Sequence, residues 1–195
     1  MNLPAKNSSA GIRGVARVRL TVAAADADAV SITGMTRDPS GVGAVGLNRH
    51  ANPDGTITLE GYRGNAFVLQ GLGGVLDSAF ADLTADRITH IGLSGDTASV
   101  TLGTTTLGTP NSIKPTNNTG RTGNVASTDQ TWTQADVNFP ITKIGLLRGN
   151  TPTAVSNIIG GVGGAAPYNE PFTIDLTNIA TWTLTMGIDV ELTAS

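Results

Sequence analysis

The sequence lacks most of the residues with which enzymes and metal sites are built. It contains no cysteine, so disulfides, thiolate ligands and cysteine nucleophiles are excluded. Its two histidines, His50 and His90, have no spacing typical of a zinc site, and no phosphate loop or Gly-x-Ser-x-Gly elbow occurs. The 15 acidic residues leave a glycosidase carboxylate pair open, but favour no particular pair. We therefore expect a non-enzymatic protein with no catalytic, metal-binding or cofactor-binding residue.

Charge is also scarce. Charged residues make up 14% of the 195 residues, the net charge is -3, and the 12 basic residues are scattered along the chain. Nucleic-acid binding depends on clustered lysine and arginine, so we expect no nucleic-acid partner. No apolar run reaches the roughly 18 residues that cross a bilayer, and "MNLPAKNSSAG" has no signal-peptide core. We expect a soluble protein without a membrane partner that is not exported by the usual route.

The residues that are abundant point to β-structure. Glycine occurs 25 times, threonine is frequent, and Gly, Pro, Asn and Asp interrupt short apolar segments throughout. In "WTLTMGIDVEL" apolar and polar residues alternate strictly, which predicts a long strand with one buried face. That face would carry Trp182, Leu184, Met186, Ile188 and Val190. Shorter alternating segments, "ARVRLTV", "ASVTLG", "ADVNFPI" and "PFTIDLTN", predict further strands of an all-β, antiparallel β-sandwich or jelly-roll-like domain.

A repeated motif supports the same fold. "ITHIGLSG" begins at Ile88 and "ITKIGLLRG" begins at Ile141. Two strands of the same design would each turn two large apolar residues to the core, which are Ile91, Leu93, Ile144 and Leu146. The position held by His90 in one copy and Lys143 in the other would then face solvent. The glycine that both copies share suggests a bulge or a close approach of another chain segment.

The two halves of the chain differ in pattern. Residues 1–86 show little sustained period, with a possible short helix at "LDSAFADLTAD", and predict an extended, partly stranded N-terminal arm region. Residues 87–195 predict the β-sandwich domain, interrupted by a long polar loop at about 108–130. Aromatic residues are few, at 4%. Trp132, beside that loop, and Tyr168 are the candidate contacts for a partner or a glycan.

Three segments in this order resemble a recurrent class of tailed-bacteriophage virion proteins. They are "RITHIGLSG", "ADVNFPITKIGLLRG" and "PFTIDLTNIATWTLTMGIDVEL", within residues 87–195. The chain departs from that class at "SGDTAS", where the class has a Gly-Thr-Gly-rich turn, and the resemblance does not extend to residues 1–85. The resemblance implies a structural virion component and carries no catalytic residue.

The resemblance and the composition together suggest a capsid decoration or cement protein. Its partners would be the major capsid protein or tail proteins and copies of itself, and it would be located in the virion after assembly in the host cytoplasm. Extended segments would then tie neighbouring subunits together, and many copies would multiply weak contacts. Two alternatives stay open. One is a tail, neck, baseplate or fibre-associated protein of the same fold, and the other is a carbohydrate-binding module for host-surface glycans.

Overall fold

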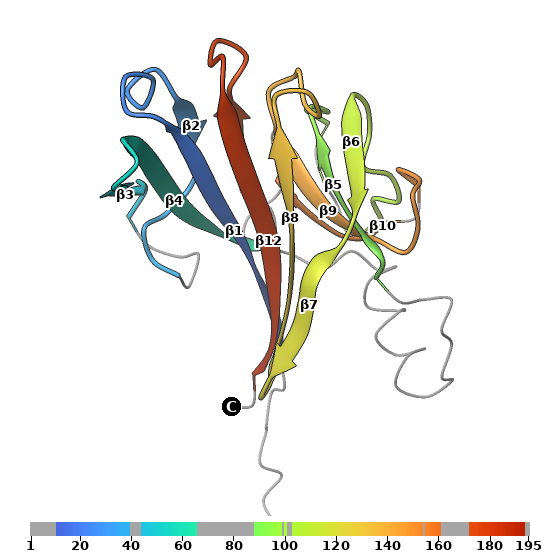
Figure 1. Cartoon of the computed structure of the whole chain (residues 1–195). Coiled ribbons are helices and arrows are strands. Elements are labelled where there is room, and N and C mark those ends of the chain that lie inside the picture. Colours follow the sequence, from blue (N-terminus) through green and yellow to red (C-terminus); the bar gives the residue numbers. More distant parts are fainter. Residues whose placement is uncertain are drawn as a thin grey trace, which may run out of the picture.

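The computed structural model describes residues 11–39, 44–65, 88–98, 100, 103–153, 155–160 and 172–193. Within these ranges the chain forms twelve strands and no helix (Figure 1). All the strand pairs are antiparallel, and they are organised as one large and two smaller sheets. The all-β prediction is confirmed, and the arrangement of sheets is consistent with a β-sandwich.

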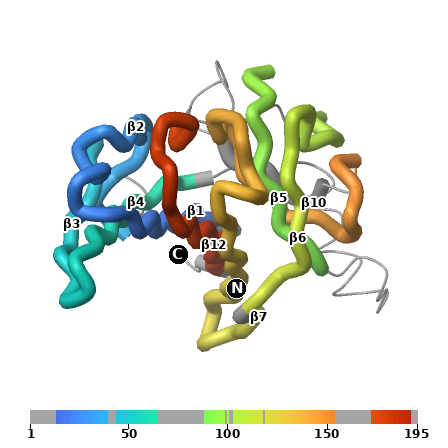
Figure 2. The backbone as a smooth tube through the Cα atoms, turned by 45° about the horizontal axis from the view of Figure 1, so that its top comes forward, coloured from blue at the N-terminus to red at the C-terminus, as the bar shows by residue number. Residues whose placement is uncertain are grey.

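The sheets contain six, four and two strands. The six-stranded sheet has the order β3 (Asn48–Ala51), β4 (Thr56–Asn65), β1 (Gly11–Ala23), β12 (Trp182–Thr193), β8 (Val125–Thr133) and β7 (Asn117–Thr122). The four-stranded sheet has the order β10 (Val155–Gly160), β9 (Lys143–Leu147), β5 (His90–Ser94) and β6 (Asn111–Pro115). The two-stranded sheet pairs β11 (Thr173–Asp175) with β2 (Ser31–Thr33). Figure 2 shows β5, β6 and β10 gathered on one side of β12, and β2, β3 and β4 on the other.

One main core joins the inward side chains of these sheets. Apolar alternation along β1 and β12 places every second side chain on the same face, and the two strands pair along nearly their whole length. The core contains the following residues expected there from the sequence: Ile91, Leu93, Ile144, Leu146, Trp182, Leu184, Met186 and Ile188. Val190 is half-buried and packs against this core.

Residues 11–65 do not form an arm, which corrects the expected division at residue 86. β1 lies between β4 and β12, in the middle of the large sheet. Its apolar residues Val18, Leu20 and Val22 are buried, because an isolated strand could not remove them from water and a central position in the sheet can. Residues 1–10 and 66–87, including the suggested helix, lie outside the described residues.

The expected polar loop at 108–130 is instead occupied by β6, β7 and most of β8. These strands escaped prediction because their exposed and half-buried positions carry Thr, Asn and Ser on both faces, so no apolar alternation is visible. Gly123, at φ 60°, opens the tight turn between β7 and β8. The expected strand "ADVNFPI" is turn and irregular chain over 135–140, and only Ile141 forms a bridge, to Ile174. In "ASVTLG", Val100 is buried outside any strand, while residues 99, 101 and 102 lie outside the described residues.

The two copies of the repeated motif lie side by side. β5 and β9 pair antiparallel with Gly92 opposite Gly145, so the copies are related by a local twofold arrangement centred on their shared glycine. The ladder between them runs without a register shift, so the glycines do not mark a bulge. A methyl group on Gly92 would lie 2.6 Å from Leu107 and 3.1 Å from Leu147. Because Gly92 has no side chain, those of Leu107 and Leu147 can pack directly against its backbone.

The outer face of this small sheet is covered, contrary to expectation. Val100 and Leu107, from the segment after β5, pack with Leu147 and the half-buried Ile113 in a second apolar cluster. Lys143, expected in solvent, has only 1% of its surface exposed. His90 is half-buried. The pattern of the repeat identified the inward face correctly, but it could not show that another segment covers the outward one.

We expect Gly92→Ala to lower the free energy of unfolding by about 1–3 kcal/mol, because the added methyl group must displace buried side chains. Leu107, Leu147 and Ile113 would all lie within 3.2 Å of it. Gly120→Ala is the matched control, since nothing lies within 4 Å of its added methyl group. Urea unfolding followed by tryptophan fluorescence measures both, and equal stability of the two variants would contradict this packing.

Candidate functional site

The outward face of the six-stranded sheet is polar and cross-linked. Arg17 pairs with Asp189 at 2.7 Å across β1 and β12, and Arg19 faces Glu60 at 3.4 Å across β1 and β4. Hydroxyl pairs continue the pattern, with Oγ1–Oγ1 distances of 3.3 Å for Thr21–Thr58 and 3.0 Å for Thr131–Thr185. Exposed ion pairs contribute little to stability, on the order of 1 kcal/mol or less each. The main feature of this face is therefore its set of hydrogen-bond donors and acceptors, which the six-stranded sheet holds in place.

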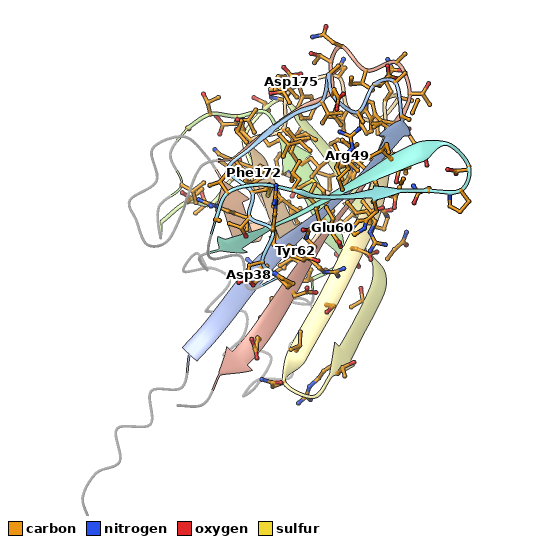
Figure 3. The ribbon with its side chains drawn as sticks, turned by 90° about the vertical axis from the view of Figure 1, so that its left-hand side faces the viewer. Asp38, Arg49, Glu60, Tyr62, Phe172 and Asp175 are labelled. Carbon is orange, nitrogen blue, oxygen red and sulfur yellow. The ribbon has the colours of Figure 1, made fainter. Side chains whose placement is uncertain are left out.

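A groove of about 260 Å³ opens in this face where β1, β3 and β4 meet. We call it the β1–β3–β4 groove, and its lining residues are Arg19, His50, Asn52, Thr58 and Glu60. Figure 3 views the molecule from this side and labels Glu60 and the neighbouring Tyr62 on β4. The lining combines a guanidinium, an imidazole, an amide, a hydroxyl and a carboxylate. Such a lining suits a ligand with several hydrogen-bonding groups.

Sheet register and one turn position these side chains. Thr58 lies opposite both Thr21 and His50, and Glu60 lies opposite both Arg19 and Asn48, so they occupy successive rungs of three strands. The turn between β3 and β4 carries Asn52, whose Nδ2 donates to Thr56 Oγ1 at 2.8 Å and to Thr58 Oγ1 at 2.9 Å. The groove is thus assembled from residues far apart in the sequence.

The turn is held from its other side by Asp54. Its carboxylate accepts the backbone N–H of Thr56 at 3.0 Å and the Thr56 hydroxyl at 2.7 Å, while Gly55 adopts a φ of 81°. These hydrogen bonds lower the pKa of Asp54. Below the groove along β4, burial and the Glu60 carboxylate raise the pKa of Tyr62. Asp54 therefore holds the turn that carries Asn52, and Tyr62 follows Glu60 on the same face of β4.

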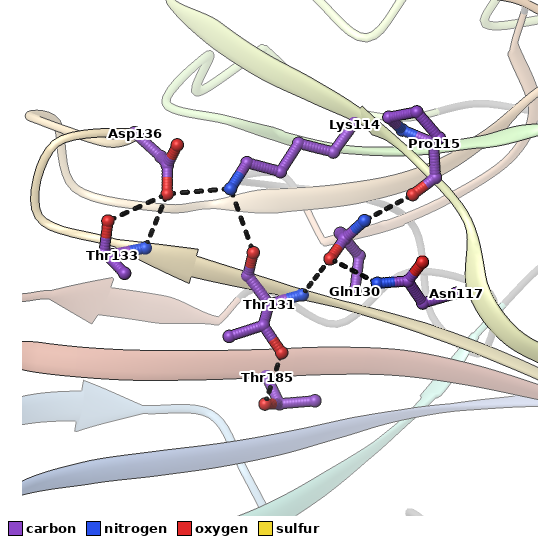
Figure 4. A network of polar contacts seen from close by, with 8 residues as sticks. All are labelled: Lys114, Pro115, Asn117, Gln130, Thr131, Thr133, Asp136 and Thr185. Atoms are coloured by element: carbon purple, nitrogen blue, oxygen red, sulfur yellow. Dashed lines mark hydrogen bonds and ion pairs between the residues drawn. The ribbon is translucent and has the colours of Figure 1, made fainter.

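A second polar cluster joins the four-stranded sheet to the six-stranded sheet where the chain passes from β6 to β7 (Figure 4). Lys114 Nζ donates to Thr131 O at 3.0 Å and pairs with Asp136 Oδ2 at 2.8 Å. Burial opposes ionisation of Asp136, but hydrogen bonds from Lys114 and Thr133 outweigh it and lower the pKa of this carboxyl. The Lys114 ammonium thereby fastens β6 to β8 and to the turn after it.

Gln130 completes this cluster. Its Nε2 donates to the carbonyl of Pro115, and its Oε1 accepts from Asn117 Nδ2 at 3.1 Å and from the Thr131 N–H at 2.6 Å. The ladder between β7 and β8 shifts register at this point, between Asn117 and Gly120. The amide therefore compensates for an irregular ladder, so the cluster has a structural role.

A third polar contact is a largely buried ion pair. Lys143 Nζ lies 2.6 Å from Asp96 Oδ2, and the Asp96 side chain keeps 25% of its surface exposed. Thr142 Oγ1 donates to the carbonyl of Asp96 at 2.8 Å, which pins the same segment to β9. The hydrogen bond from Lys143 lowers the pKa of Asp96. This pair holds the segment after β5 against the four-stranded sheet.

The aromatic residues expected at a binding surface lie elsewhere or outside the described residues. Trp132 has none of its surface exposed and lies in the main core, opposite Leu184 on β12. This corrects its expected role as a partner or glycan contact, because an indole enclosed by the core cannot reach a ligand. Tyr168 lies outside the residues that the structure describes.

Sequence reasoning did not identify the residues of the groove. The "NPDG" turn at 52–55 was a local signal, because Asn, Pro, Asp and Gly are typical of turns. The pairing of β1 with β4 and of β4 with β3, which brings Arg19 and His50 beside that turn, has no local signal. The groove could be found only after the register of three strands was known.

In the part of the chain described, no three or more His, Cys, Asp or Glu residues are grouped so as to hold a metal ion. The same residues include no helix with the length and apolar character needed to cross a membrane. Comparisons with models of protein families, with curated proteins and with solved structures found no match for this chain.

Proposed function

We propose that the chain is a non-enzymatic structural component of a bacteriophage virion, namely a capsid decoration protein that binds the shell and neighbouring copies of itself. The resemblance of residues 87–195 to tailed-phage virion proteins supports this proposal. The resembling segments contain β5, β9 and the run from β11 to β12, which pack in one core. The three segments that carry the resemblance therefore belong to one folded unit.

The observation that carries the proposal is the position of the first and last strands. Gly11, at the start of β1, pairs with Thr193, at the end of β12. β1 thus begins and β12 ends at the same end of the six-stranded sheet, where the chain also turns from β7 to β8 (Figure 1). A protein with that geometry can be attached through one end while the loops at the other end point away. Repetition on a lattice would strengthen each weak attachment.

We expect deletion of residues 2–10 to reduce incorporation into particles by about tenfold or more, through loss of an attachment repeated over many copies. A deletion through residue 20 is unsuitable, because it would remove most of the central strand β1. The number of chains per purified particle, by quantitative mass spectrometry, is the measurement. Removal of residues 194–195, which follow Thr193 in the sequence, is the matched control.

Unchanged fluorescence of the buried tryptophans Trp132 and Trp182 would show that the deletion variant is folded. Incorporation of this folded variant at the wild-type level would contradict attachment through residues 2–10. The same count separates the alternative location in the tail, neck or baseplate. A shell protein is present in copies on the order of hundreds, whereas a tail part is present in a small multiple set by ring symmetry.

A further inference from the structure

We propose that the β1–β3–β4 groove binds one sugar residue of a glycan through neighbouring hydroxyl groups. The inference rests on the groove alone and does not depend on the proposed role in a virion. It also differs from the expectation based on Trp132, which lies in the core. Five residues line the groove: Arg19, His50, Asn52, Thr58 and Glu60.

Arg19 and Glu60 are the charged pair that lines the groove, and they retain capacity for a ligand. Their closest contact is long, with Nη2 3.4 Å from Oε1. The Arg19 side chain is 64% exposed, and a guanidinium has five N–H donors. Glu60 is more enclosed, with 20% of its side chain exposed. Its carboxylate already accepts a hydrogen bond from the Tyr62 hydroxyl, and its two oxygens have lone pairs for further donors. Two adjacent hydroxyl groups can therefore donate to Glu60 and accept from Arg19 at once.

Asn52 and His50 extend this pattern along the groove. Both described hydrogen bonds of Asn52 use its Nδ2, which leaves Oδ1 as an acceptor. His50 lies opposite Thr58 and is exposed, so its ring can donate or accept. The hydrogen bond from Asn52 orients the Thr58 hydroxyl. Asp54 stabilises the β3–β4 turn that carries Asn52 by accepting a hydrogen bond from Thr56. The polar groups are therefore arranged before a ligand arrives, which lowers the entropy cost of binding.

The balance of charge selects the chemical class of the ligand. One guanidinium and one carboxylate face each other, so a phosphate or carboxylate ligand would meet repulsion from Glu60. An apolar ligand would leave the polar lining without hydrogen-bond partners, which disfavours its binding. A sugar hydroxyl is both donor and acceptor, and a sugar ring carries several at fixed spacing. The groove, at about 260 Å³, is small by the standards of ligand sites and suits a single ring.

The test is a titration of the full-length protein followed by its backbone amide signals in two-dimensional NMR spectra. The probes are glucose, galactose, mannose and N-acetylglucosamine, each added separately, and then inorganic phosphate. For at least one sugar we expect signals of Arg19, His50, Asn52 and Glu60 to shift with a Kd of about 1 mM, as suits a small, open site that holds a single ring.

Glu60→Gln should weaken the binding of that sugar about tenfold or more, because the variant loses a charged hydrogen-bond acceptor. Glu191→Gln is the matched control. It removes a carboxylate from the same sheet, opposite Arg13 and near the end where the first and last strands meet, and should leave the affinity unchanged. The proposal is overturned if none of the four sugars shifts the groove signals, if Glu60→Gln binds as the wild type does, or if phosphate binds the groove as well as the sugar.

Discussion

Asp96→Ala is expected to lower the free energy of unfolding by about 3–5 kcal/mol, because it leaves a buried ammonium without its counter-charge. Lys143 is 1% exposed and lies 2.6 Å from the Asp96 carboxylate. Neither water nor a rotation of the side chain can easily replace this partner. Urea unfolding at neutral pH, followed by tryptophan fluorescence, measures the loss.

Substitution of the lysine should lower the free energy of unfolding less than Asp96→Ala does, and this difference is the sharper test. Lys143→Met keeps an unbranched side chain in the space beside Asp96, and the freed carboxylate, at 25% exposure, can still be hydrated. In the Lys143→Met background, Asp96→Ala should have little further effect, because the interaction it removes is already lost. A loss from Lys143→Met as large as that from Asp96→Ala would contradict the burial of the lysine.

The same pair predicts a dependence on pH. Its hydrogen bond with Lys143 holds the pKa of Asp96 below the unfolded value of about 3.9. The stabilising contribution is therefore fully present above the unfolded pKa, and it is lost as the pH falls through the folded pKa. The wild type should lose more stability than Lys143→Met over this acid range, and parallel pH profiles would contradict the pairing.

Trp132→Ala is the second substitution with a large expected effect, a loss of about 3–5 kcal/mol of unfolding free energy. The indole is completely buried in the main core, opposite Leu184, so its removal leaves a large cavity. Trp132→Phe should cost less, because it keeps an aromatic ring in that space. Because both variants lack one fluorophore, urea unfolding is followed by circular dichroism.

This substitution also separates two roles for Trp132. A surface contact would lose binding on substitution with alanine and keep its stability, since substitutions on an exposed surface change stability by about 0.5 kcal/mol or less. Substitution of a core residue with alanine would instead lower the stability of the whole protein. Trp132→Ala with wild-type stability would contradict the position of the indole in the core.

The strands with a two-sided pattern could be predicted from the sequence. In β12 and β1, apolar residues alternate with Thr, Arg and Asp, and the same alternation is seen in the structure. The repeated motif also identified the core side chains of β5 and β9. Periodicity works in these places because burial on one face and solvation on the other leave opposite compositions.

Other elements had no such signal. β7 is polar throughout, and hydroxyl and amide hydrogen bonds such as Thr119–Thr128 at 3.0 Å take the place of apolar packing. Lys143 resembled a surface residue because its partner, Asp96, comes from a segment whose path over the sheet no local pattern encodes. The groove required the pairing of β4 with both β1 and β3. Long-range pairing, which depends on the whole set of strands, was the missing information in each case.

The central proposal is that the chain is a capsid decoration protein of a bacteriophage. A cryo-EM map of the intact particle in which it would reside tests this proposal most directly. We predict density for this three-sheet fold repeated over the shell lattice, with the end where β1 begins and β12 terminates turned toward the shell. Density for the fold confined to the tail, or particles from which the chain is missing, would contradict a decoration protein.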